Sequence, residues 1–101
     1  MAKLLEREIK FRGETTRGQL VYGDLLRQHA KTLIYDGAYN QVKPDSVCQL
    51  IAIDNNNHEV YEHDALYYLG TSIMKSATFR DYAAIEDGLA VKMVRRPGDA
   101  V

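Results

Sequence analysis

The segment from Val42 to Asp64 constrains the fold of this chain more than any other part of the sequence. It joins an apolar run, residues 47–53, to a second short run, residues 59–61, through the polar cluster at residues 54–57. Asparagine and aspartate tolerate left-handed backbone angles and hydrogen-bond their own main chain, so a cluster of them between apolar runs reverses the chain. The segment therefore predicts a β-hairpin. Both faces of the 47–53 strand are mostly apolar, which predicts a central, buried position.

Two further runs predict strands nearer the N-terminus. Residues 6–13 alternate apolar and charged side chains, as in a strand with one solvated face, and we expect Gly13 to close this strand. Residues 19–26 form a second apolar run, which Gly23 interrupts. Glycine inside a strand commonly marks a bulge or the close approach of another backbone. We expect these first two strands to pair.

The remaining strands are predicted from turn signals and alternation. Residues 32–35 and 39–42 flank the turn pair Asp36-Gly37 and predict a second hairpin. Residues 65–69 continue as a strand after the central hairpin. Residues 89–94 alternate as in a last strand.

Two segments leave helix and strand open. Residues 27–31 fit a helical turn or a loop equally well, because they are too few to hold a helix alone. Residues 73–85 fit an amphipathic helix or two short strands. We therefore predict a mainly β fold of antiparallel hairpins, forming a small barrel or sandwich, with one short helix between Ile73 and Ile85. The alternative is an α+β fold with helices at residues 25–31 and 73–84.

Length and composition are those of an ordinary globular domain. The chain has 101 residues, 46% of them hydrophobic and 27% charged, so we expect one domain over residues 1–101 with a polar C-terminal tail at residues 95–101. Cys48 is the single cysteine, which excludes an internal disulfide and a cysteine-based zinc site. Apolar runs fall short of the roughly 20 residues of a membrane helix, and the N-terminal acidic residues do not fit a secretory signal. We expect a cytoplasmic protein that does not contact membranes.

Three sequence blocks occur in a specific order. The first is residues 7–13, REIKFRG, followed after a turn by residues 21–25, VYGDL. The second is residues 42–49, VKPDSVCQ, and the third is residues 54–64, DNNNHEVYEHD. Together they resemble the YopX family, small proteins encoded by bacteriophages and prophages, whose corresponding segments read V-x-P-E-T-V-G-Q and D-x-N-G-x-E-I-Y-E-G-D.

The chain departs from the YopX pattern at several positions. Cys48 stands where the family usually has glycine, and Asn57 and His58 replace the turn Asn-Gly region. His63 replaces the glycine of E-G-D, which puts a side chain where the family typically has none. The resemblance implies a compact, β-rich phage protein in a bacterial host cell. It supplies no agreed catalytic residues.

Several residues of the matched blocks are expected to hold turns rather than to do chemistry. A carboxylate beside a glycine turn, as at Asp24, can accept backbone N–H groups or pair with Arg12 or Arg7, and so fix how two hairpins meet. Cys48 lies between apolar neighbours, which predicts a buried, inert thiol. The predicted turn and motif residues are Gly13, Gly23, Asp24, Pro44, Asn55, Asn56 and Asp64.

Residues 58–64 hold the one concentration of metal-capable side chains in the sequence. A zinc or manganese site needs three or four convergent ligands. His58, His63 and Asp64 are weak candidates, because alternation along a strand sends neighbouring side chains to opposite faces. We expect no metal, no other cofactor and no catalytic residues. A metal-assisted hydrolase is therefore the weakest of the functional hypotheses.

Nucleic-acid binding is the main alternative function. Thirteen Lys and Arg against fourteen Asp and Glu give a formal charge of -1, so binding would need a local basic patch. Lys10, Arg12 and Lys92 are candidates for this patch, and Tyr22 is a candidate for base stacking, on a small β-barrel that binds single strands. The overall charge argues against this reading.

The leading hypothesis is a non-enzymatic interaction or assembly module. Short hairpins leave strand edges, and tyrosine-rich edges favour self-association. We therefore expect a homo-oligomer, with an unknown phage or host protein as a further partner.

Overall fold

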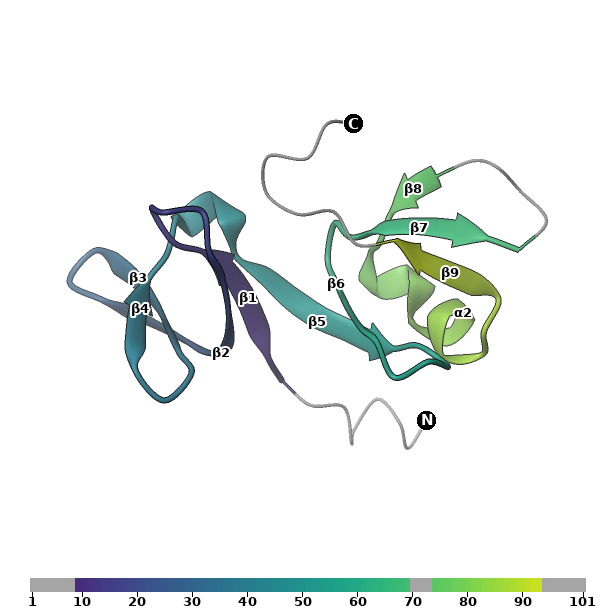
Figure 1. The fold of residues 1–101 in the computed structure, drawn as a ribbon, viewed down its shortest axis with the longest axis horizontal. Coiled ribbons are helices and arrows are strands. Elements are labelled where there is room, and N and C mark those ends of the chain that lie inside the picture. Colours follow the sequence, from purple (N-terminus) through teal and green to yellow (C-terminus); the bar gives the residue numbers. More distant parts are fainter. Residues whose placement is uncertain (1–8, 70–73, 94–101) are drawn as a thin grey trace. The chain divides into compact units, whose positions relative to one another are not determined.

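The computed structural model describes residues 9–69 and 74–93, which fall into two compact units (Figure 1). The first unit ends at Leu50 and the second begins at Ile51. Strands dominate both units, and each strand pair with a described register is antiparallel. The predicted mainly β, antiparallel fold is thus confirmed. One domain over residues 1–101 stays a prediction, because two compact units can still unfold as one cooperative fold.

The first unit contains most of a six-stranded sheet of order β4-β3-β2-β1-β5-β6, in which residues 51–53 of β5 and the strand β6 (Glu59–Tyr61) belong to the second unit. A 3₁₀ turn, Pro44–Ser46, connects β4 to β5. The core of the unit includes Ile34, Val42 and Leu50, all of which are buried. The strands are β1 (Phe11–Glu14), β2 (Leu20–Gln28), β3 (Lys31–Tyr35), β4 (Tyr39–Gln41) and β5 (Cys48–Ile53).

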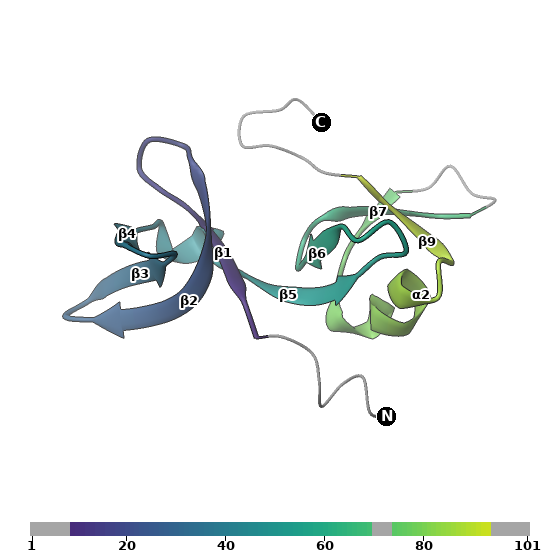
Figure 2. The ribbon, with the colours of Figure 1, turned by 60° about the horizontal axis from the view of Figure 1, so that its bottom comes forward.

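The strand β2 bends at Gly23 and changes partner there (Figure 2). Residues 20–23 pair with β1 and residues 24–28 pair with β3. A Cβ atom placed on Gly23 would lie 1.9 Å from the carbonyl oxygen of Tyr35. The predicted pairing of the first two strands and the close backbone approach at this glycine are both confirmed.

The first strand is shorter than predicted, and Gly13 lies inside it. β1 begins at Phe11, while residues 6–8 of the predicted strand lie outside the described residues. A Cβ on Gly13 would lie 2.8 Å from Cδ1 of Ile34, so close packing against the core requires glycine here. The prediction that this residue closes the strand is therefore wrong.

The sheet curls but does not close into a barrel. One isolated antiparallel bridge joins Thr15 to Val42, and the backbone N–H of Lys43 donates to the carbonyl of Glu14 at 2.8 Å. These contacts bring the end of β4 toward the end of β1. In neither of the two described sheets do the edge strands pair with each other, so a closed barrel is not formed.

The second unit packs a three-stranded sheet, β8-β7-β9, against a short helical segment (Figures 1 and 2). A hairpin of β5 and β6 completes it, as predicted from the Asp and Asn cluster. Its elements are β6 (Glu59–Tyr61), β7 (Ala65–Tyr68), β8 (Met74–Ser76), the 3₁₀ turn Phe79–Asp81, α2 (Tyr82–Glu86) and β9 (Ala90–Met93). The shared core comprises Ile51, Ala52, Val60, Leu66, Ala77, Tyr82, Ile85 and Ala90.

Two segments that the sequence left open are now assigned. Residues 27–31 form the β2–β3 hairpin, with His29 and Ala30 at φ 52° and 64° in the turn, so the alternative helix at residues 25–31 is wrong. Residues 74–85 combine a strand with helical turns, because Thr78 caps the 3₁₀ turn and starts the helix late. The predicted polar tail at residues 95–101 lies outside the described residues. Among the helices of the described segments, none has the length and apolar character needed to cross a membrane.

Candidate functional site

The sheet β8-β7-β9 has one face buried in the core and one face turned outward. Leu66 of β7 pairs with Lys75 of β8 and with Lys92 of β9, and Leu66 is fully buried in the core. The next residue, Tyr67, pairs with Met74 and Val91. Because side chains alternate along a strand, this second row faces away from the core.

We call this second side of the sheet the outer face. Leu69, Leu89 and Val91 are 63%, 57% and 48% exposed, values that are high for aliphatic residues. Among the described residues of the outer face, none carries a formal charge. The described residues on this side are Tyr67, Leu69, Met74, Ser76, Leu89 and Val91, together with Ala65, which is buried.

The lysines of β8 and β9 point to the inner side of the same sheet. Nζ of Lys75 lies 3.0 Å from a carboxylate oxygen of Asp81, and Nζ of Lys92 donates to the carbonyl oxygen of Glu59. Lys92 is thus bound within the second unit. The two ammonium groups leave the outer face uncharged.

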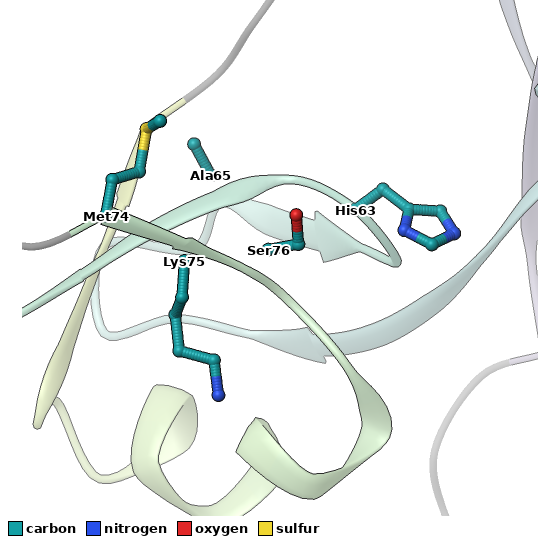
Figure 3. Close-up of a pocket in the computed structure, with 5 residues that line it drawn as sticks. All are labelled: His63, Ala65, Met74, Lys75 and Ser76. Atoms are coloured by element: carbon teal, nitrogen blue, oxygen red, sulfur yellow. The ribbon is translucent and has the colours of Figure 1, made fainter.

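A hollow of about 260 Å³ opens at one end of the outer face (Figure 3). Ala65, Met74 and Ser76 point to the same side of the sheet, whereas Lys75, which also lines the hollow, extends its side chain toward the helical turns. His63 forms the rim and has a left-handed backbone, φ 70°. A non-glycine residue in this conformation costs about 1–2 kcal/mol, so the rim is held in place by its surroundings.

The turn before the hollow is fixed by Asp64, which is buried. Its carboxylate accepts the backbone N–H of Tyr61 at 2.9 Å, and its carbonyl accepts the N–H of Ala77 at 2.7 Å. The N–H of His63 donates to the carbonyl of Ala77 at 2.9 Å. Asp64 therefore acts as a backbone acceptor that joins the β6–β7 turn to the residue after β8.

A buried carboxylate organises the inner side of the sheet. Asp81 accepts hydrogen bonds from the hydroxyl of Tyr68, from Nζ of Lys75 at 3.0 Å and from the backbone N–H of Thr78 at 2.9 Å. Burial alone would raise the pKa of Asp81, but these hydrogen bonds outweigh it and hold the pKa below 3.8. The hydrogen bond to Asp81 raises the pKa of Tyr68 and, likewise, the pKa of Lys75. The cluster ties the helical segment to β7 and β8.

The weak metal candidates are not gathered into a metal site. Nδ1 of His58 lies 3.5 Å from a carboxylate oxygen of Asp54, whereas the Asp64 carboxylate accepts the backbone N–H of Tyr61 and His63 is exposed. Within residues 9–69 and 74–93, no group of three or more His, Cys, Asp or Glu could hold a metal ion. The free thiol of Cys48 is buried, as predicted.

The predicted turn residues lie in several different places. Asn55 and Asn56 lie in the β5–β6 turn, where Asp54 supplies the acceptor: its Oδ1 takes the N–H of Asn56 at 2.9 Å. Pro44 begins the 3₁₀ turn before β5. Asp24 is exposed on β2, across from Tyr35.

The nucleic-acid candidates fall in both units. Lys10 and Arg12 are half-buried in the first unit, and Tyr22 is 40% exposed and paired with Arg12 across β1 and β2. On the same unit the rings of Tyr35 and Tyr39 lie 4.9 Å apart, and both side chains are exposed. The first unit therefore carries three exposed tyrosines, of which Tyr22 pairs with the predicted Arg12.

No protein-family model, curated protein or solved structure matched this chain when it was compared with them. Sequence reasoning missed the outer face and the Asp81 cluster. The alternation of Tyr67 and Leu69, and of Leu89 and Val91, was a signal for an apolar strand face. It did not say whether that face is covered.

Proposed function

We propose that the protein is a non-enzymatic interaction or assembly module that forms homo-oligomers through the outer face. The observation that supports this best is the row of exposed aliphatic side chains, Leu69, Leu89 and Val91, on a face without formal charge. Scattered exposed apolar residues are normal on a protein surface, but a contiguous apolar face commonly marks an interaction site.

The size of the face sets the expected strength of association. Along the strand direction, the five residues from Ala65 to Leu69 extend about 17 Å. Across the sheet, the three strands extend about 14 Å, so the area of the outer face is about 240 Å². Stable interfaces bury roughly 800 Å² on each partner. Association through this face alone should therefore be weak, with a dissociation constant on the order of tens to hundreds of micromolar.

Sedimentation analysis over a range of concentrations tests this proposal. The wild-type chain should move from monomer to oligomer as the concentration rises through that range, and Val91→Glu should stay monomeric because a carboxylate would be desolvated in the contact. Ile53→Glu is the matched control, since Ile53 is 41% exposed on β5 and lies outside the outer face. A wild-type chain that remains monomeric at about 1 mM would refute the proposal.

Single-strand nucleic-acid binding is a second candidate, supported by the exposed tyrosines of the first unit. Tyr35 and Tyr39 present adjacent rings, and base stacking on aromatic side chains is sequence-tolerant. Affinity for an oligonucleotide should fall steeply with salt and should weaken in Arg12→Glu, whereas Arg80→Glu in the second unit should have little effect. Absence of binding at low salt would remove this candidate.

A phage or prophage origin, with action in the cytoplasm of a bacterial host, belongs to the same proposal. The three YopX-like blocks fall on β1 and β2, on the segment that enters β5, and on the β5–β6 hairpin with its following turn. The φ of 70° at His63 supports the resemblance, because the family has glycine there and this backbone favours glycine. An experimental structure of a YopX protein with a different strand order over these blocks would count against the assignment.

A further inference from the structure

The outward side of strands β2, β3 and β4 carries a row of three side chains, one from each strand. Asp24 pairs with Tyr35, and Tyr35 pairs with Tyr39, so the three lie side by side across the strands. Ile34, the residue before Tyr35, is fully buried, so alternation along β3 turns this row away from the core. Asp24 is exposed, and Tyr35 and Tyr39 are 43% and 65% exposed. We call these three residues the tyrosine row.

The tyrosine row is held in place by contacts within the hairpin of β3 and β4. The ring centroids of Tyr35 and Tyr39 lie 4.9 Å apart with the ring planes tilted by 53°, a geometry that aromatic pairs prefer. In the loop between the two strands, Nδ2 of Asn40 donates to Oδ1 of Asp36 at 2.9 Å. Rings that already pack against each other lose little conformational freedom when a ligand binds on them.

The charge around the tyrosine row favours a cation. Asp24 forms no ion pair with Arg12 or with any other described residue, and Asp36 adds a second exposed carboxylate next to Tyr35 in the chain. Lys31 lies on the same side, but it is four residues along β3 from Tyr35, about 13 Å away, and the screening length at physiological salt is about 8 Å. A cation that binds on the rings therefore meets negative charge.

Arginine is the cation that suits this arrangement best. Its planar guanidinium can stack on a tyrosine ring while its N–H groups bind a carboxylate, whereas the lysine ammonium is a point charge without a flat surface. On the same side of the sheet, the next row pairs Leu26, which is 38% exposed, with Leu33. Rows lie two residues apart, about 7 Å, which is also the spacing of alternate side chains in an extended peptide.

We propose that the tyrosine row binds an arginine side chain of a partner protein, in an extended segment whose residue two positions away packs on Leu26 and Leu33. The guanidinium lies on the ring surface and donates to the carboxylate of Asp24. This inference goes beyond the proposed self-association, because the tyrosine row and the outer face belong to different units. Nucleic acid would use the same rings for base stacking, but it would bring phosphate groups beside the carboxylates of Asp24 and Asp36, which repel them.

Titration of the isotope-labelled full chain with short peptides, followed by NMR chemical shifts, tests this inference. The capped peptide Gly-Arg-Gly-Leu-Gly should bind with a dissociation constant on the order of 1 mM. The same peptide with lysine in place of arginine should bind at least about 3-fold more weakly. Tyr39→Leu should raise the dissociation constant about 2- to 5-fold, the effect of one exposed cation–π contact, whereas Tyr39→Phe keeps the ring and should leave it unchanged.

Neutralisation of Asp24 distinguishes a cationic ligand from an anionic one. Asp24→Asn should raise the dissociation constant of the arginine peptide about 3-fold. The matched control is Asp45→Asn, which changes the net charge equally at an exposed site in the 3₁₀ turn before β5. Equal binding of the arginine and lysine peptides, or an effect of Asp24→Asn no larger than that of the control, would overturn the inference. An oligothymidine that binds more tightly to Asp24→Asn than to the wild type and loses affinity in Tyr39→Leu would also overturn it, and each of these results would leave the proposed self-association standing.

Discussion

Replacement of Asp81 is the most direct test of what holds the second unit together. Its side chain is buried and accepts hydrogen bonds from Tyr68, Lys75 and Thr78. Asp81→Ala removes these acceptors together with the capping box around Thr78. Breaking a buried charged network by removing one partner costs about 3–5 kcal/mol. We expect this loss in the free energy of unfolding of the second unit.

The residues that donate hydrogen bonds to Asp81 should contribute unequally to the stability of the second unit. The side chain of Lys75 is 45% exposed, so solvent screening limits its ion pair to about 0–1 kcal/mol. A hydrogen bond to a charged group that is shielded from solvent contributes about 1.5–3 kcal/mol. We therefore expect Tyr68→Phe to destabilise the unit by about 2 kcal/mol and Lys75→Met by less than about 1 kcal/mol.

Asp81 also gives the stability a pH dependence of definite sign. Its folded-state pKa is held below 3.8 by hydrogen bonds that outweigh burial. A carboxyl group whose pKa is lowered by folding stabilises the fold above its unfolded-state pKa, and this stabilisation is lost as the pH falls through the folded-state value. The free energy of unfolding should decline below about pH 4 in the wild type and decline less in Asp81→Asn.

Urea denaturation at pH 7 and at pH 3 measures the loss of stability in the Asp81 variants and its dependence on pH. The seven tyrosines serve as the fluorescence probe, and far-UV circular dichroism gives a second signal. The matched control is Asp87→Asn, because Asp87 is exposed at the end of α2 and its loss should change stability by less than about 0.5 kcal/mol. If Asp81→Ala cost no more than this control, or if Asp81→Asn kept the wild-type pH slope, the account of the cluster would be refuted.

Three further substitutions probe the backbone, each followed by urea denaturation. Ala30→Gly should stabilise the β2–β3 hairpin by about 1 kcal/mol, because φ is 64° at this residue. The control is Ala38→Gly, which lies outside the left-handed region and should not raise the stability of the protein. Equal changes in the free energy of unfolding for the two variants would contradict this prediction. Gly23→Ala should cost at least about 3 kcal/mol, because its Cβ would lie 1.9 Å from a carbonyl oxygen of β3. Gly37→Ala meets no neighbouring atom, so it should cost only the strain of its φ of 111°, about 1–2 kcal/mol. His63→Gly should add about 1 kcal/mol to the stability of the second unit, and a loss would mean that the imidazole makes a stabilising contact.

The sequence was most informative where local chemistry decides the structure. The β5–β6 hairpin follows from the Asp and Asn cluster, and Asp54 accepts the N–H groups of Asn56 and His58, as an Asx-type turn requires. Gly23 was correctly read as a place where two backbones approach closely. In both cases the residue type at one position carries the signal.

Prediction failed where distant residues decide the structure. The β2–β3 turn has His29 and Ala30 in left-handed conformations, whereas Asn-Gly is the usual signal for such a turn, so the residue types at these positions do not indicate it. The role of Asp81 depends on Tyr68, 13 residues away, and on Lys75, 6 residues away. The outer face depends on register between three strands, which alternation along one strand does not specify.

The placement of two lysines explains why association should use the face of the sheet rather than its edges. Among the described strands, β8 and β9 are the two edges of the sheet, and each carries one lysine on the side of the core, Lys75 and Lys92. Inward-pointing charged residues on edge strands are a known protection against edge-to-edge pairing, because a newly added strand would have to bury or displace them. Both ammonium groups also have partners at the inner side, Asp81 and the carbonyl of Glu59, so turning them outward would break contacts that hold the unit together. The same alternation that keeps these charges on the inner side leaves the opposite side of the sheet apolar, and a flat contact between two such sides needs no new strand pairing.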